Sequence, residues 1–222
     1  MRKKIIVGGV LALLFVMSMV SAQISYEPTK DSKVAKALPT NNFGNGNYMI
    51  VNPKQGGTDR SYLGFDLGQQ GVVNSATLDV VTYWAGSATI GQKVQAWFCP
   101  NKDFNELTIN WNNQPATWDI YGNPTIVTQI LLYGKYLVNR VTKGNNGCTL
   151  ADEYTITSTT IQGNPETHHV WELTSEVNSD SDKKFVVVLK APTETFGDNS
   201  RYVQYLTRNY AEALYRPHLI VS

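Results

Sequence analysis

The chain consists of short apolar or alternating segments separated by turn residues, and no stretch of it carries a long helical period. Residues 76–84 alternate, with Ala76 and Leu78 on one side, as in a strand with one buried face. Residues 185–190 form a nearly continuous apolar run, as in a central strand buried on both faces. About ten to twelve such segments, divided by Gly, Asn and Pro, predict an all-β fold, an antiparallel β-sandwich that is jelly-roll-like.

The other elements follow from the same patterns. Leu107, Ile109 and Trp111 alternate with polar residues before Pro115, which predicts a strand that ends at a turn. Further strands are predicted over residues 33–36, 48–51, 60–67, 93–98, 153–162, 169–173, 202–206 and 218–221, with a strand or short helix over 125–133 and one helical turn within 174–180.

The first residues resemble an export signal rather than part of the fold. A basic start is followed by an apolar run over residues 5–20 and by the small residues Ser21 and Ala22, the pattern of a secretory signal peptide cleaved after Ala22. The alternative is a membrane anchor, but the run is shorter than the ~20 residues that a span needs. We therefore predict a signal peptide over residues 1–22 and one secreted domain over residues 23–222, extracellular or at the cell surface and free of the membrane once the signal is cut.

Charge and cysteine content restrict the partners and the compartment. The formal net charge is +1, and no Lys/Arg cluster follows the signal, so nucleic acid is not an expected partner. The two cysteines, Cys99 and Cys148, either pair as a disulfide, which export would favour, or remain two separate buried thiols.

The segment 104–115 resembles a known signature. It contains Glu106, Trp111, Asn112, Asn113 and Pro115, which match the W-x-E-x-x-x-x-W-N-N-x-P motif of the DNRLRE-type secreted domain, a β-sandwich family related to carbohydrate-binding modules. Phe104 stands in place of the first Trp of that motif. Further blocks match in the expected order over residues 42–51, 60–67, 75–78 and 207–219.

The resemblance implies a jelly-roll-like sandwich and an extracellular, often polysaccharide-associated role, usually as a module of a larger surface protein. The chain departs from the pattern at Gly64, which replaces an Arg, and at Asn209, which replaces an acid. Residues 118–162 are longer than usual and have no clear counterpart.

Aromatic and amide side chains predict where a sugar would bind. Sugar rings stack their C–H faces on aromatic planes, while amides and Arg bond to the hydroxyls. Trp111 is expected to pack in the core under a corner, and Trp118 to be more exposed. The candidate carbohydrate-binding residues are Trp84, Trp118, Tyr121, Asn112, Asn113 and Arg208.

Two kinds of charged group are considered for other roles. Arg60, Arg208 and Arg216 either form buried ion pairs with Asp59 and Asp66 or bind an acidic sugar. A structural calcium ion is the only cofactor considered. Its candidate ligands, by position alone, are Asp31, Asn42 and Asp66.

Catalysis finds no support in the motifs. The chain lacks His-Glu-x-x-His, G-x-S-x-G, a P-loop and G-x-G-x-x-G. His168 and His169 are neighbours in a predicted strand, so their side chains point to opposite faces and would not chelate together. Glu106 is the only acid within the signature and has no predicted catalytic partner. We predict a protein without enzymatic activity.

Three functions follow in order of preference. The first is a secreted, non-catalytic protein that binds an extracellular polysaccharide or a cell-surface glycan. The second is a self-assembling subunit of an extracellular sheath or filament, which adds its polar arm over residues 23–33 as a strand to a neighbour's sheet. The third is a polysaccharide lyase or hydrolase that depends on Glu106.

Overall fold

The computed structural model describes residues 22–118, 124–132, 136–143, 147–161, 167–197 and 200–222, with the backbone alone for 124–132 and 136–143. The predicted signal peptide lies outside these residues except for Ala22. The strands are β1 (Ile24–Tyr26), β2 (Lys30–Ala35), β3 (Tyr48–Val51), β4 (Asp59–Asp66), β5 (Ala76–Ala85), β6 (Lys93–Pro100), β7 (Thr117–Trp118), β8 (Pro124–Leu132), β9 (Tyr136–Lys143), β10 (Thr149–Thr155), β11 (Thr167–Glu172), β12 (Lys184–Lys190), β13 (Val203–Leu206) and β14 (His218–Val221). Helix α1 (Thr174–Ser179) and two 3₁₀ turns, η1 (Ser87–Thr89) and η2 (Ala213–Tyr215), complete the described elements.

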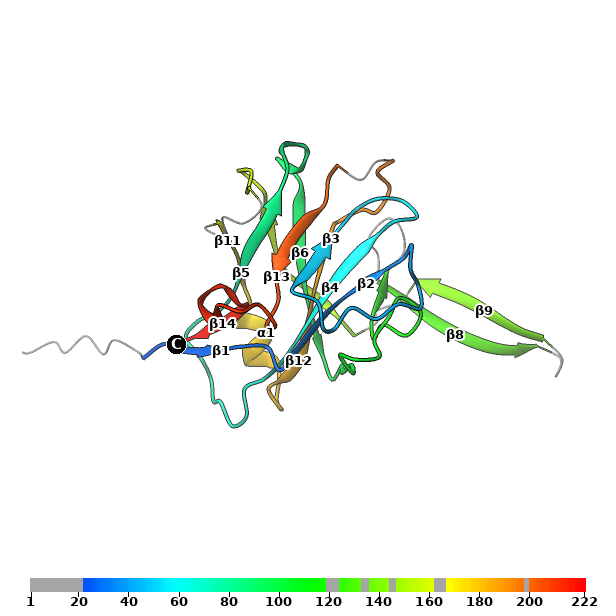
Figure 1. Ribbon diagram of the computed structural model, residues 1–222. Helices are drawn as coiled ribbons and strands as arrows, with labels where there is room; N and C mark the ends of the chain where they lie inside the picture. Colours follow the sequence, from blue (N-terminus) through cyan, green and yellow to red (C-terminus); the bar gives the residue numbers. More distant parts are fainter. Residues whose placement is uncertain (1–21, 119–123, 133–135, 144–146, 162–166, 198–199) are drawn as a thin grey trace, which may run out of the picture.

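Two antiparallel sheets pack face to face, which confirms the predicted β-sandwich (Figure 1). Sheet A has the order β1-β14-β5-β13-β3, and β11 pairs with the other edge of β5. Sheet B has the order β10-β6-β12-β4-β2. The apolar run predicted as a central strand is β12, which lies between β6 and β4.

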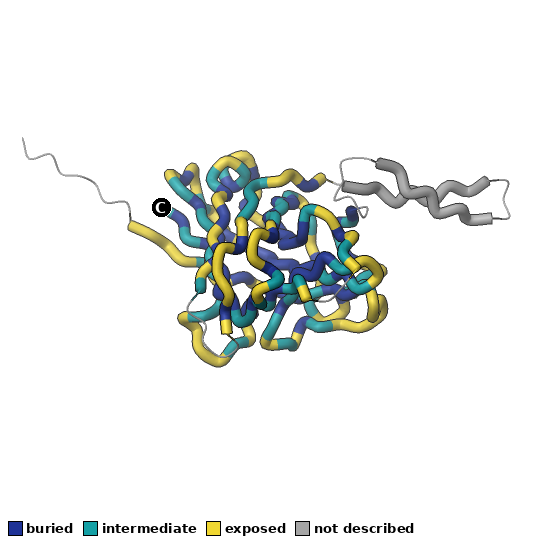
Figure 2. The backbone as a smooth tube through the Cα atoms, turned by 90° about the horizontal axis from the view of Figure 1, so that it is seen from above, coloured by how far each residue is buried: buried dark blue, intermediate teal, exposed yellow. Residues whose placement is uncertain are grey.

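The main core lies between the sheets. Side chains of one parity on each strand meet there, among them Val187 and Leu189 from sheet B and Trp171 and Tyr205 from sheet A. The indole of Trp171 donates to the carbonyl of Val94 at 3.0 Å, so its polar atom is satisfied. Figure 2 shows these buried segments inside a rim of exposed loops.

A second core lies on the outer face of sheet B. Residues 101–118, named here the cover segment, fold over that face and bury Phe104, Ile109 and Trp118 against Tyr62 and Val188. Before β7, the cover segment consists of turns and irregular chain rather than the strand predicted over 107–111. That prediction was wrong because Ile109 is buried while Leu107, at the same alternating position, is 59% exposed.

The insertion over residues 118–162 contains a hairpin. β8 pairs with β9 from Thr125 to Leu132, and β7 adds two residues to this third sheet. Figure 1 shows the hairpin projecting from the sandwich. The disulfide between Cys99 and Cys148 is confirmed, and it joins the end of β6 to the chain just before β10.

The N-terminal arm is not a free strand donor. β1 pairs with β14, with Ile24 opposite Val221, and β2 pairs with β4. Both strands are therefore used within the chain's own sheets, where they form an edge of sheet A and an edge of sheet B. No helix in the described residues is long and apolar enough to cross a membrane.

Candidate functional site

The outer face of sheet A carries four aromatic side chains in two stacked pairs. Tyr48 and Tyr83 have ring centroids 4.3 Å apart at an interplanar angle of 30°. Trp84 and Tyr202 are also 4.3 Å apart, at 23°. All four side chains are partly exposed. We name these residues the aromatic patch.

Strand register explains how the patch forms. Met49 and Tyr205 face the core, so Tyr48 and Gln204, one residue away, face outward. The register between β13 and β5 shifts so that Gln204 pairs with Trp84 while Tyr205 pairs with Thr82. Such a bulge re-aims side chains.

Glycine is required beside the indole. A Cβ atom on Gly86 would lie 2.8 Å from an atom of the Trp84 ring, which is closer than real Cβ atoms approach. Gly86 therefore lets the ring lie flat against the turn that follows β5. The ring is held between this turn and Tyr202, so the patch is preorganised before any ligand arrives.

The phenols of the patch act as hydrogen-bonding groups. The hydrogen bond between Tyr48 and Tyr83, together with burial, raises the pKa of Tyr48 to about 12. Tyr48 therefore keeps its proton at every physiological pH and can donate a hydrogen bond.

A groove adjoins the patch at the edge of sheet A beyond β3. Its volume is about 400 Å³. We name it the side groove, and its lining includes Phe43, Ile50, Asn52, Lys54, Tyr202 and Gln204. The ammonium of Lys33 lies 4.6 Å from the ring centroid of Phe43 at its mouth. Aromatic and aliphatic surface with a few amide and charged groups is the usual composition of a small-ligand site.

The predicted binding residues are distributed differently. Trp84 lies in the aromatic patch. Trp118 is only 6% exposed, and its expected exposure is wrong because the cover segment forms a second core. Tyr121 lies outside the described residues. Tyr48, Tyr83 and Tyr202 were missed, although their alternating strand positions could have suggested an outward face.

The two adjacent asparagines serve a turn. Asn113 accepts from the amide of Asn110 at 2.7 Å, and its own side-chain amide donates to the carbonyl of Thr108 at 3.0 Å. The backbone amide of Asn112 donates to Asn110 Oδ1 at 3.0 Å. Asn112 and Asn113 are exposed, but they lie on the cover segment and so on the outer side of sheet B.

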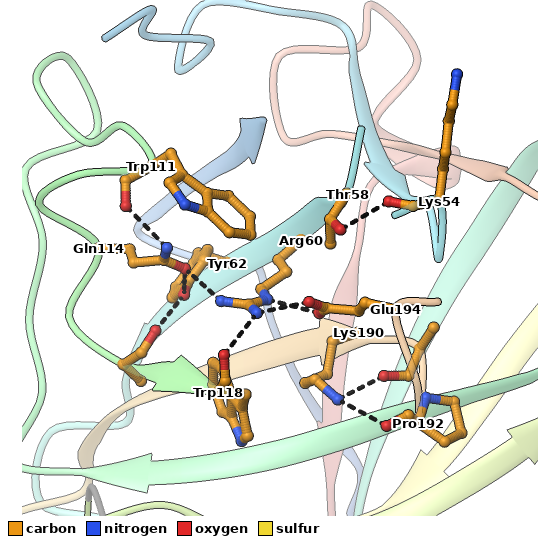
Figure 3. Close-up of polar contacts among 12 residues, drawn as sticks. Lys54, Thr58, Arg60, Tyr62, Trp111, Gln114, Trp118, Lys190, Pro192 and Glu194 are labelled. Carbon is orange, nitrogen blue, oxygen red and sulfur yellow. Dashed lines mark hydrogen bonds and ion pairs between the residues drawn. The ribbon is translucent and has the colours of Figure 1, made fainter. Parts of the chain in front are cut away.

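Arg60 is the centre of a buried network under the cover segment (Figure 3). Its guanidinium donates to both carboxylate oxygens of Glu194 at 2.8 and 2.7 Å and to Gln114 Oε1 at 3.0 Å. The indoles of Trp111 and Trp118 lie 4.5 and 5.2 Å from it. Arg60 and Glu194 are almost fully buried, so this network holds the fold together and is not a ligand site.

A second network surrounds Glu106 and explains the signature around it. Arg208 forms a bidentate pair with Glu106, with Nε 2.9 Å from Oε1. Glu106 Oε1 also accepts from the backbone amide of Asp31 at 2.9 Å. The guanidinium of Arg208 and the carboxylate of Glu106 therefore hold each other, and the pair joins the cover segment to the chain that follows β13.

The predicted arginine pairs exist with other partners. Arg60, Arg208 and Arg216 pair with Glu194, Glu106 and Glu27 rather than with Asp59 or Asp66. Asp66 instead pairs with Lys184 at 3.1 Å.

Burial dominates the electrostatics of Asp31. Desolvation raises its pKa to about 7, opposed by its hydrogen bond from the amide of Arg208 and reinforced by the nearby charge of Glu106. Its Oδ1 atom is buried without a hydrogen-bond partner among the described residues.

The calcium candidates do not form one site. The Asn42 side-chain amide donates to the carbonyls of Glu106 and Ile109 at 2.7 and 2.8 Å, while Asp31 and Asp66 have the partners given above. Over the ranges that the structure describes, no three His, Cys, Asp or Glu residues are grouped so as to hold a metal ion. The structure therefore gives calcium no support at these residues.

Comparison with known proteins adds one match. The family model of carbohydrate-binding module family 96 matches residues 22–188, from the start of the described chain through most of β12. No curated protein matches the chain.

Proposed function

Because the chain belongs to carbohydrate-binding module family 96, we propose that it is a secreted, non-catalytic protein that binds an extracellular polysaccharide or a cell-surface glycan through the aromatic patch and the side groove. Membership of a family of binding modules supports the absence of catalysis. One observation supports the proposed location of the binding site: two stacked aromatic pairs share an outward face of sheet A.

The chemistry of the face fits a sugar. The partly exposed rings offer apolar planes for the C–H faces of pyranose rings. Gln204 is partly exposed beside them and bears an amide that can both donate and accept. Rigid strands hold these groups in place, which lowers the entropy lost on binding. Predicted residues Asn112, Asn113 and Arg208 take no part in this proposal.

Export is part of the same proposal. The signal pattern over residues 1–22 and the disulfide between Cys99 and Cys148 both fit a protein that matures outside the cytoplasm. The DNRLRE-type resemblance is proposed to reflect the same lineage as the family match. Mass spectrometry of protein recovered from the medium or cell surface should give an N-terminus at Gln23; an intact residue 1 would refute export by cleavage there.

Retention on polysaccharides tests the binding site. Affinity electrophoresis through gels that contain purified surface polysaccharides should retard the wild-type protein. Tyr202→Ala should reduce the affinity for the retained polymer about tenfold, which corresponds to ~1.4 kcal/mol. Val72→Ala, at a position 88% exposed outside the patch and groove, is the matched control and should migrate as wild type.

Two results would contradict the proposal. Failure of every tested polysaccharide to retard the wild type would remove the binding function. Retardation that Tyr202→Ala and Trp84→Ala leave unchanged would keep the function but move the site elsewhere. Circular dichroism of each variant checks that the strand signal is intact.

A further inference from the structure

A second hollow lies on the same outer face of sheet A, toward β1 and β14. It has a volume of about 650 Å³. We name it the polar hollow and define it by Asp79, Val81, His168, Arg216, His218 and Ile220. Val81 is buried and Ile220 partly so, while the other four residues carry polar groups. Ala213 and the exposed side chain of Leu214 also line it, so the hollow combines an apolar floor with a rim that is polar on one part and apolar on another.

Hydrogen bonds fix the imidazoles of the rim. His168 Nδ1 lies 2.8 Å from Asp79 Oδ1, which orients its ring and leaves Nε2 for a ligand. His218 Nε2 donates to the carbonyl of Ala213 at 3.3 Å, so its Nδ1 accepts from the Ser25 hydroxyl at 2.9 Å. The side chain of His168 is 46% exposed. A ligand in the hollow would thus meet the ring of His168, which Asp79 holds in place, and the hydroxyl of Ser25, which is bonded to His218.

Strand geometry places the polar hollow in line with the aromatic patch. Asp79 and Val81 line the hollow, and Tyr83 is the next residue of that parity along β5. Alternate residues of a strand share one face. The bulge that follows brings Trp84 to the same face. Floor and patch are therefore successive parts of one strip along β5.

The length of this strip indicates how long a sugar chain it can bind. Trp84 lies five positions after Asp79 on one strand, which corresponds to roughly 17 Å at ~3.3 Å per residue. That distance exceeds the length of a disaccharide. Both hollows are open at the surface that the described residues form, so a sugar chain can extend beyond either of them.

We infer that the polar hollow is a second glycan subsite and that the protein binds a linear polysaccharide along its length, at internal sugar units, rather than a single sugar or a chain end. This inference rests on the proposed function, because it requires the aromatic patch to be the first subsite. Stacking on the patch would set the position of the chain, and the rim of the polar hollow would bond to hydroxyls several rings away.

A length series tests the inference. Isothermal calorimetry would compare disaccharides to octasaccharides cut from the polysaccharide that the gels retain best, with cello-oligosaccharides as a fixed comparison series. For the wild type, the affinity should rise about tenfold or more between the disaccharide and the length that spans both subsites, and then level off. An affinity independent of length would overturn the inference while leaving the proposed function intact.

Variants show which residues produce the higher affinity for longer oligosaccharides. His168→Ala removes the exposed rim group, and Ile220→Trp fills the floor without touching the patch. Each should lower the ratio of long-chain to short-chain affinity toward one. Tyr202→Ala should instead weaken all lengths and keep the ratio, and Val72→Ala should change neither. Hollow variants that keep the wild-type ratio would overturn the second subsite, and a wild type that binds no oligosaccharide would remove both proposals.

Discussion

At the scale of single residues, Asp31 and His169 are buried titratable groups with opposite effects on how the stability of the fold depends on pH. Burial raises the pKa of Asp31 to about 7. Burial, with a smaller effect of His168, lowers the pKa of His169 to about 4. His169 Nδ1 lies 2.9 Å from the Tyr205 hydroxyl, whose pKa is raised well above its usual value, so the phenol keeps its proton and donates a hydrogen bond to the neutral ring.

Whether each group stabilises the fold at low or at high pH depends on whether the folded or the unfolded chain binds its proton more tightly. Folded Asp31 holds its proton more tightly than the unfolded chain, so its contribution to stability is full below about pH 4 and is lost as the pH rises through about 7. Folded His169 binds a proton more weakly, so its contribution is full above about pH 6.5 and is lost as the pH falls through about 4. Between these limits the two slopes partly cancel.

Asp31→Asn should therefore change the pH profile of stability. The variant keeps an oxygen that can accept from the amide of Arg208 but no longer titrates, so its stability relative to wild type should increase as the pH rises from about 4 to 7. Urea unfolding across that range measures the difference. Asp103→Asn is the contrasting control: Lys30 lowers the pKa of Asp103, so the contribution of Asp103 is already full above about pH 4, and the stability of this variant relative to wild type should stay nearly constant from about pH 4 to 7. A relative stability of Asp31→Asn that does not vary with pH would contradict the assignment.

The Arg60–Glu194 pair should be among the most sensitive positions. Glu194→Gln leaves a buried guanidinium without its counter-charge, which typically costs about 3–5 kcal/mol. Glu27→Gln breaks the exposed pair with Arg216 and should cost less than about 1 kcal/mol. Chemical denaturation of both variants checks the ranking, and equal losses would show that the buried charge is compensated by other groups.

At the scale of elements, the cover segment is held by three separate parts of the chain. The Asn42 side chain donates to two of its carbonyls, Arg208 pairs with Glu106, and Arg60 bonds to Gln114. Gly44 fits directly beneath it, since a Cβ there would overlap the carbonyl oxygen of Glu106. The segment is therefore a third layer with its own anchors.

Gly44→Ala should loosen this layer. Because the overlapping atom belongs to the backbone, the cover segment must shift, and overpacking of this kind typically costs about 1–3 kcal/mol. Gly71→Ala is the matched control, because a Cβ there meets nothing within 4 Å. Thermal unfolding compares them. If the Gly44→Ala protein is as stable as the control, the cover segment can shift without a loss of folding stability, which would contradict the prediction.

The sequence was most informative where one strand's pattern decides the outcome. The apolar run of β12, the boundaries of β3 and the helical turn of α1 were predicted, and Trp84 was among the predicted site residues. The third layer was not predictable, because its burial depends on contacts with sheet B. For the same reason Trp118 was expected at the surface.

Contacts between residues far apart in the sequence were also not predictable. Tyr48 and Tyr83 belong to β3 and β5, and Tyr202 directly precedes β13; these three strands meet only through sheet pairing. The partners of the arginines likewise came from distant glutamates rather than from nearby aspartates. Local patterns predict which residues face outward, but not which outward residues become neighbours.

At the scale of the whole molecule, the disulfide marks where the projecting hairpin leaves the sandwich. Cys99 and Cys148 are 49 residues apart, and the cover segment and β8–β9 lie between them. Both cysteines are buried in the second core. The bond therefore keeps the ends of this long excursion together at the edge of sheet B.

Removing the disulfide should lower stability without removing the fold. The double variant Cys99→Ser/Cys148→Ser frees the unfolded chain from a long closed loop, which typically costs about 2–4 kcal/mol. Guanidinium unfolding of the variant and of wild type, with and without reductant, measures the loss. Reductant should destabilise only the wild type, and a variant as stable as the oxidised wild type would contradict the estimate.

The pairing of Ile24 with Val221 also determines how the domain responds to tension. A pull between these two positions acts at adjacent ends of β1 and β14 and at right angles to the strands, so it would break their hydrogen bonds one at a time, like a zipper. A protein tethered at both ends should therefore open at low force.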